Sequence, residues 1–184
     1  MIGKSLVLGF LLTSSVCALA QVVPEAYKNT GRLTAGGYYS YFDTNYAGNR
    51  MTGLGAYLDW TAPILWHLGA EAEGRWLVFG ASHDFSQYTY LIGPRYRIPV
   101  GRRLQPYAKL LVGAGEVNFP YQLGHGGYFA IAPGGGIDFK VERRWRLRAD
   151  YEYQIWPNAV GIPGIPSSTL KPNGVSVGIS YQVF

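Results

Sequence analysis

The most constraining feature of this chain is a strict alternation of apolar and polar residues along residues 145–155. Because successive side chains of a β-strand point to opposite faces, this pattern predicts a strand with one apolar and one ionic face. A strand of a soluble protein can alternate in the same way, so the segment alone does not show which face meets water. The apolar positions are Leu147, Ala149, Tyr151, Tyr153 and Ile155, and the polar positions are Arg146, Arg148, Asp150, Glu152 and Gln154.

The same alternation recurs along the chain. No long segment has the 3.6-residue period of a helix, and the 25 glycines and 15 tyrosines suit many strands and turns. Lengths of about 10 to 14 residues suit strands that cross a bilayer at a tilt. The eight predicted strands are residues 32–42, 51–60, 67–77, 88–98, 104–115, 127–140, 145–155 and 174–184.

The chain begins with the features of an export signal. Lys4 is followed by an apolar stretch at residues 6–12 and by Ala18-Leu19-Ala20, which predicts cleavage after Ala20. The apolar stretch is shorter than the roughly 20 residues that a membrane-spanning helix needs. Cys17 lies inside this signal, so the mature chain has no thiol for a disulfide, a metal site or catalysis.

The formal charge is +5, from 16 basic and 11 acidic residues, and loss of Lys4 with the signal leaves +4. A basic chain can bind nucleic acid, but export to an envelope compartment argues against a nucleic-acid partner. An integral membrane protein without an apolar helix must span the membrane as a closed sheet, because lipid cannot satisfy open backbone groups.

The connections between the predicted strands alternate in length, as in an up-and-down barrel with both chain ends on the periplasmic side. The short connections are residues 61–66, 99–103 and 141–143, and the long, outer ones are residues 43–50, 78–87, 116–125 and 156–173. The last is rich in proline and glycine and is predicted to be irregular. Pro94, Pro106 and Pro133 fall inside strands, where they predict bulges or strand ends.

Charge balance indicates which face points inward. Five acidic and five basic residues share the ionic faces, and an eight-stranded barrel is just wide enough for side chains to fill it. We therefore predict an ion-pair network in the lumen. Its members are Glu71, Glu73, Arg75, Arg95, Arg97, Lys109, Asp138, Arg148, Asp150 and Glu152.

Aromatic residues on the opposite faces support this assignment. Eight strands cannot enclose so many rings, as a soluble barrel of the lipocalin type would have to, whereas rings on the outside of a membrane barrel form interfacial girdles. The predicted membrane-facing aromatics are Tyr39, Tyr41, Trp60, Trp76, Tyr88, Tyr90, Tyr96, Phe129, Phe139, Tyr151 and Tyr153.

Several short motifs resemble the small outer-membrane β-barrel domain family, which is OmpA-like in architecture. They are Pro106-Tyr107-Ala108-Lys109, Gly113-Ala114-Gly115, Gly134-Gly135-Gly136-Ile137-Asp138 and Asp150-Tyr151-Glu152-Tyr153. The resemblance implies an all-β fold, a closed eight-stranded antiparallel up-and-down transmembrane β-barrel, in the cell outer membrane. It also implies that Phe184 is an assembly signal for the barrel-assembly machinery. The usual aromatic two residues earlier is replaced by Gln182, so the last strand is expected to end near Val183.

The sequence contains few candidates for a catalytic, metal-binding or phosphate-binding site. Ser82-His83-Asp84 is the best cluster, but adjacent residues of an extended chain point apart, and His67 and His125 share no face with it. Residues 134–136 are not followed by the Lys-Ser/Thr of a phosphate loop. We predict no catalytic, cofactor-binding or metal-binding residue.

These inferences divide the chain into a signal peptide at residues 1–20, a periplasmic segment at 21–31 and an outer-membrane β-barrel at 32–184. We expect a non-enzymatic protein with a structural or surface-interaction role through its extracellular loops. Its expected partners are outer-membrane lipids, the barrel-assembly machinery and an extracellular ligand. A lipid-modifying enzyme that uses His83 and a narrow channel are the alternatives.

Four arginines lie by the short turns and are expected to contact anionic lipid headgroups. They are Arg102, Arg103, Arg143 and Arg144.

Overall fold

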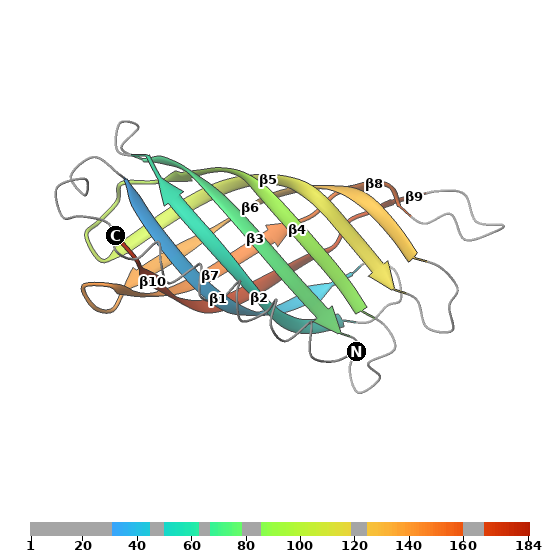
Figure 1. The fold of residues 1–184 in the computed structure, drawn as a ribbon, viewed down its shortest axis with the longest axis horizontal. Helices are drawn as coiled ribbons and strands as arrows, with labels where there is room; N and C mark the ends of the chain where they lie inside the picture. The colour runs from blue at the N-terminus through green and yellow to red at the C-terminus, as the bar shows by residue number, and fades with distance from the viewer. Residues whose placement is uncertain (1–30, 45–49, 63–66, 79–85, 119–124, 160–167) are drawn as a thin grey trace, which may run out of the picture.

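The computed structural model describes residues 31–44, 50–62, 67–78, 86–118, 125–159 and 168–184, and these form a closed barrel of eight long antiparallel strands (Figure 1). The predicted all-β fold is confirmed. Around the barrel the strands follow the order β1-β10-β7-β6-β5-β4-β3-β2. The barrel strands are β1 Arg32–Asp43, β2 Arg50–Thr61, β3 Leu68–Val78, β4 Ser86–Arg97, β5 Leu104–Asn118, β6 His125–Lys140, β7 Trp145–Tyr153 and β10 Asn173–Gln182.

Closure depends on the pairing of the first and last strands. β1 and β10 pair from Thr34↔Gln182 to Asp43↔Asn173. Next to the Thr34↔Gln182 pair, the Leu33 amide donates to the Phe184 carbonyl at 3.2 Å, and the Val183 amide donates to the Leu33 carbonyl at 2.8 Å. The barrel thus has no free edge strand, which is the condition for a sheet to enter lipid.

The alternation seen in the sequence is the alternation of burial in the structure. Along β7, every second residue from Arg146 to Glu152 is buried, whereas Trp145, Leu147, Ala149 and Tyr151 are exposed. A shift of register by one residue would turn the ionic side chains outward and the apolar ones inward. The pattern of β7 therefore fixes its register against both neighbours.

The connections form two groups, as predicted. Residues 62–67, 98–103 and 141–144 join strands at what we call the short-turn end, where β1 begins and β10 ends. Residues 44–49, 79–85, 119–124 and 154–172 join strands at the long-loop end. Within the described residues, no helix has the length and apolarity needed to cross a membrane.

The bulges expected at the prolines are not present. Pro106 and Pro133 lie in one uninterrupted β5–β6 register. The β4–β5 pairing omits Pro94 and keeps the same register on both sides of it. β6 also does not end at Pro133, but its pairing with β7 does, because β7 ends at Tyr153, directly opposite that proline, and pairing returns only as the bridge Ile131↔Ile155. A missing amide donor interrupts these ladders without an inserted residue.

The long connection between β7 and β10 was predicted to be irregular, but part of it forms regular structure. It contains a hairpin of β8, Trp156–Ala159, and β9, Ser168–Leu170, with a shift of register between its pairs. Proline and glycine dominate residues 161–166 but are sparse in the two strands. The hairpin is stable because Trp156, Ala159 and Leu170 are buried.

Ile92 provides a test of which medium surrounds the barrel. It lies in the middle of β4 with 60% of its surface exposed, and Val100 is a matched apolar residue, 68% exposed, in a short turn. We expect Ile92→Arg to destabilise the bilayer-embedded barrel by about 2–4 kcal/mol, because a charge near the bilayer midplane loses its hydration. Val100→Arg is expected to have little effect. Urea unfolding in lipid vesicles measures both, and equal values would contradict an outer face that meets lipid.

Candidate functional site

The barrel interior holds an unusual concentration of buried charge. All ten residues of the predicted lumen network are at least 94% buried, and two further charged residues, Asp59 and Arg146, are buried with them. The twelve side chains comprise six acids and six bases. Asp59 alternates with Leu58 and Trp60, and Arg146 alternates with Trp145 and Leu147, so the rule that identified the other ten also applies to these two.

Lys109 of β5 is the centre of the network. Its ammonium nitrogen lies 2.9 Å from Glu73 Oε2, 2.9 Å from Glu152 Oε2, 3.2 Å from Asp150 Oδ1 and 3.3 Å from Glu71 Oε1. The four carboxylates come from β3 and β7, each of which is separated from β5 by one strand of the barrel. One lysine therefore holds together strands that do not pair with β5 in the sheet.

Two arginines extend the network to other strands. Arg75 Nη1 donates to Glu152 Oε1 at 2.8 Å, and its Nη2 lies 3.1 Å from Glu73 Oε1. Arg148 Nη1 donates to Glu71 Oε2 at 2.8 Å, and its Nε donates to Asp138 Oδ1 at 3.0 Å. These side-chain contacts link β3 to β6 and β7, strands with which β3 has no backbone pairing.

A second group of ion pairs involves Arg95 and Arg97 of β4. Both guanidinium groups donate to the same oxygen of Asp59, and Arg95 also donates to Asp138 Oδ2. Arginine suits such sharing because its planar group carries five donors.

Aromatic rings also occupy the interior, and sequence reasoning missed them because it considered only charge on these faces. Tyr38, Phe42, Tyr57 and Tyr107 are all buried. The guanidinium carbon of Arg148 lies 3.6 Å from the ring centre of Tyr57, and that of Arg75 lies 4.3 Å from the ring centre of Phe42. The rings fill the space between the ion pairs and stabilise the cations by cation–π contact.

Some interior positions must be glycine for these rings to fit. A Cβ atom on Gly55 would lie 2.3 Å from the Tyr38 ring, and a Cβ atom on Gly115 would lie 2.4 Å from the Trp156 ring. Real Cβ atoms do not approach that closely, so both rings can occupy these places only because the residues beside them have no side chain.

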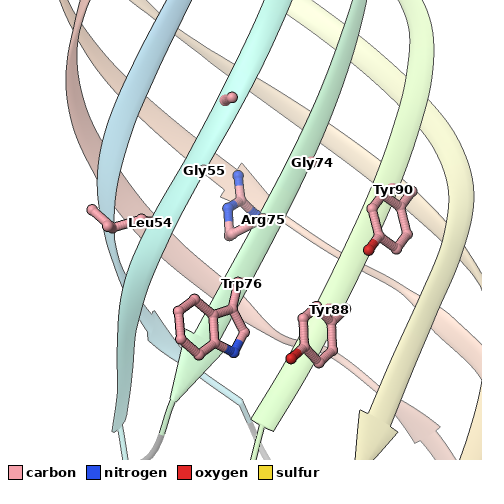
Figure 2. A pocket seen from close by; sticks show the side chains of 8 residues that line it. Leu54, Gly55, Gly74, Arg75, Trp76, Tyr88 and Tyr90 are labelled. Atoms are coloured by element: carbon pink, nitrogen blue, oxygen red, sulfur yellow. The ribbon is translucent and has the colours of Figure 1, made fainter. Parts of the chain in front are cut away.

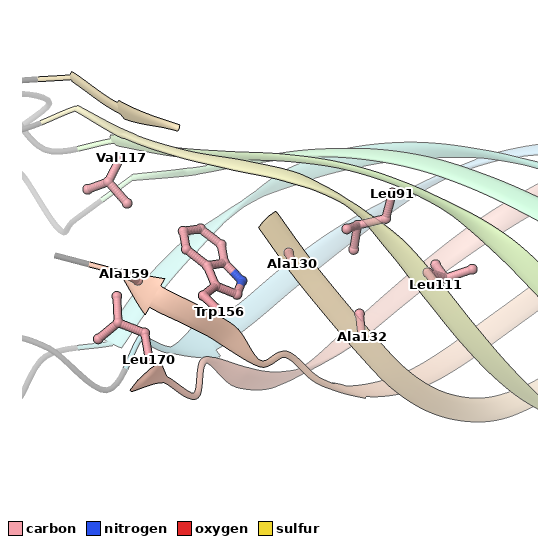
Figure 3. Packing of buried hydrophobic residues seen from close by; sticks show 8 residues of the cluster. All are labelled: Leu91, Leu111, Val117, Ala130, Ala132, Trp156, Ala159 and Leu170. Atoms are coloured by element: carbon pink, nitrogen blue, oxygen red, sulfur yellow. The ribbon is translucent and has the colours of Figure 1, made fainter. Parts of the chain in front are cut away.

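Trp156 closes the lumen toward the long-loop end. Its side chain is fully buried among residues of β4, β5, β6 and the β8–β9 hairpin (Figure 3). Trp156 Nε1 donates to Gln154 Oε1 at 2.9 Å, and Gln154 Nε2 donates to Glu152 Oε1 at 2.7 Å. The apolar cluster is thereby tied to the charged network. Its members are Leu91, Leu111, Val117, Ala130, Ala132, Trp156, Ala159 and Leu170.

The outer surface carries the predicted aromatics. Nine of the eleven are exposed, and Tyr88 and Tyr153 are partly exposed. Figure 2 shows Trp76 and Tyr88 side by side over β3 and β4, and their rings stack with centres 6.4 Å apart and planes 10° apart. Arg75, next to Trp76 in sequence, is buried in the lumen. Contact of these rings with lipid remains a prediction.

The other predicted features have mixed outcomes. β10 ends at Gln182, one residue before the expected end, and Phe184 is partly buried beyond it, so its role in assembly remains a prediction. The signal peptide, Ser82-His83-Asp84 and most of the periplasmic segment lie outside the described residues, as does the side chain of His125. His67 is partly exposed, and its ring centre lies 6.3 Å from that of Tyr96, with the two ring planes 77° apart.

The sequence model of one protein family, described as "Outer membrane protein beta-barrel domain", matches residues 8–182. No curated protein sequence matches the chain.

Solved structures with a similar fold include Neisserial surface protein A, at 11% identity and TM-score 0.61, covering 82% of this chain and 95% of that one. The N-terminal β-barrel domain of OprF from Pseudomonas aeruginosa has 9% identity and TM-score 0.57, with coverages of 84% and 98%. Ail, the attachment invasion locus protein of Yersinia pestis, has 16% identity and TM-score 0.52, with coverages of 84% and 98%. At such low identities these similarities show the fold alone.

Lys109 offers a direct test of the network. We expect Lys109→Met to destabilise the barrel by about 3–5 kcal/mol, because it leaves buried carboxylates without their shared cation. Lys140→Met removes the same charge from a partly exposed strand end and is expected to change stability by less than about 0.5 kcal/mol. Chemical denaturation in detergent micelles measures both variants. A Lys109→Met barrel as stable as the parent would show that the four carboxylates need no cation.

Proposed function

The chain belongs to the outer membrane protein β-barrel domain family and lies in the cell outer membrane, and we propose that it is a non-enzymatic surface protein that acts through its extracellular connections. In this proposal the long-loop end faces the outside of the cell, and residues 1–20 are removed as a signal peptide. The barrel serves as a rigid support for residues 43–50, 78–87, 116–125 and 156–173.

The filled lumen is the observation that carries the proposal. In the described part of the barrel, twelve buried charged residues and four buried aromatic rings occupy the interior, and the Trp156 cluster closes it toward the long-loop end. A transport route needs a continuous polar or apolar path, and a catalytic site needs a reachable cluster of reactive groups. A filled lumen favours neither role, and the connections at the long-loop end are then the parts best placed to bind a partner outside the cell.

Known relatives of this architecture support a binding role at the surface. One solved structure of Ail is a complex with the heparin analogue sucrose octasulfate. In the present chain the charged residues of the four outer connections are Asp43, Arg50, Asp84, Glu116 and Lys171, which sum to −1. A partner held mainly by polar and aromatic contacts therefore suits these connections better than a strongly charged polymer.

The barrel also needs partners that insert and hold it. We propose that the exposed aromatics contact outer-membrane lipids and that the C-terminal strand with Phe184 is read by the barrel-assembly machinery. Support comes from the exposed rings on the outer surface and from Phe184, which follows the strand that closes the barrel.

A replacement of residues 160–167 by glycine and serine tests the surface role. We expect cells with the parent barrel to adhere to at least one of immobilised collagen and fibronectin, and the variant to lose at least about fivefold of that adhesion. Heat-dependent gel mobility checks that both barrels are folded. Adhesion to these surfaces that equals a vector control for the parent protein would count against the proposal.

Conductance and lipid chemistry test the alternatives. Planar bilayers with the purified barrel are expected to show no stable openings, since the lumen is filled and closed by Trp156. Mass spectra of lipid A from cells with and without the protein are expected to be identical. Steady ohmic conductance would support a narrow channel, and a mass change in lipid A would support a lipid-modifying enzyme.

A further inference from the structure

We propose that the short-turn end of the lumen is a binding site for a phosphate group, held by Arg32 and Arg97. This site lies at the opposite end of the barrel from the surface connections and is independent of their role. Its ligand class is an oxyanion of the aqueous compartment or the headgroup of an anionic phospholipid.

The ion pairs divide the interior charge unequally. Around Lys109, four carboxylates share Lys109, Arg75 and part of Arg148. Around Asp59 and Asp138 there is the opposite excess, because four arginines lie near these two carboxylates. Asp138 also binds Arg148, and the one contact of the four with another carboxylate that the ion pairs include is that of Arg95 Nε with Glu71 Oε2, at 3.4 Å. These four, the arginine cluster, are Arg32, Arg95, Arg97 and Arg146.

The arginine cluster has more donors than acceptors. In the described residues, Arg32 Nε, Arg97 Nε, Arg97 Nη1 and Arg146 Nη1 are buried without a hydrogen-bond acceptor. Arg97 is 5% exposed and Arg146 is 2% exposed, so these side chains are largely shielded from bulk solvent. A buried donor without an acceptor is costly, and several in one place call for an added acceptor.

A cavity is lined by two of these arginines, Arg32 and Arg97. It has a volume of about 220 Å³ and is lined by the side chains of Arg32, Arg97, His67 and Gln105 and by the turn at residues 98–101. Because one water takes about 30 Å³ of liquid, the cavity holds a phosphate with several waters. The two arginines come from strands that do not pair, since Arg32 is the first residue of β1 and Arg97 is the last residue of β4.

Phosphate fits this group of donors better than a carboxylate does. Guanidinium groups bind phosphate through two parallel hydrogen bonds, and phosphate has enough oxygens to accept from more than one arginine. The site thus offers unpaired donors from two arginines, which suits a phosphate oxyanion.

Arg32→Gln is the decisive variant. Arg32 forms no salt bridge within the described ranges, so its removal leaves no carboxylate without a cation and the barrel is expected to fold. Arg103→Gln is the matched control, because Arg103 is exposed in the same short turn but does not line the cavity. Isothermal titration of inorganic phosphate into the barrel in maltoside micelles, which contain no phosphate, measures affinity. We expect saturable binding that weakens at least about tenfold in Arg32→Gln and less than about twofold in Arg103→Gln.

A second arm separates the two sources of the phosphate group. The same proteins are titrated with phosphatidylglycerol in micelles and followed by ³¹P NMR. Binding of inorganic phosphate identifies a free oxyanion, and binding of phosphatidylglycerol alone, sensitive to Arg32→Gln, identifies a headgroup. If neither binds, or if binding is unchanged in Arg32→Gln, the proposal is overturned. Should Arg32→Gln lose its heat-dependent gel mobility, Arg32→Lys replaces it, with a weaker but measurable affinity expected from loss of the two-donor contact.

Discussion

The ladder between β1 and β10 is the contact on which the rest of the structure depends. A sheet that enters lipid must pair every backbone donor and acceptor internally, and the pairing from Thr34↔Gln182 to Asp43↔Asn173 completes that requirement. Closure with eight strands makes the interior narrow, so that side chains fill it. The polar face of every strand is then forced into a small volume, where charges are tolerable only as pairs. The ion-pair network is thus a consequence of closing the sheet.

Much of this arrangement follows from period-two alternation. The strand at residues 145–155, with Tyr151 outside and Asp150 and Glu152 inside, shows the reasoning that located all eight strands within about three residues at their ends. The register of each pair was not predictable residue by residue, but a fixed inner face left few registers open. The excess of arginine near Asp59 was not predictable, because it depends on which residues of distant strands share a height in the barrel.

The features that were missed come from packing between residues far apart in sequence. Tyr38 and Tyr107 lie on the polar faces of their strands, and a tyrosine hydroxyl suits an interior that holds ions. Their burial is explained only by contacts with other strands, because the Tyr38 ring packs against Gly55 and the Tyr107 hydroxyl donates to Asp150. The hairpin of β8 and β9 was hidden by the prolines and glycines between its strands. Its stability comes from the fit of Trp156 against Gly115, which no local pattern reveals.

The lumen network has a further consequence for how long the protein remains folded. Arg75 and Glu152 are 77 residues apart, as are Glu71 and Arg148, so neither pair can form until the strands between them have assembled. Contacts that form after the rate-limiting step of folding slow unfolding without speeding folding. We therefore expect the charged interior to slow unfolding and to lengthen the time that the barrel stays folded in the membrane, which is a kinetic property distinct from its equilibrium stability.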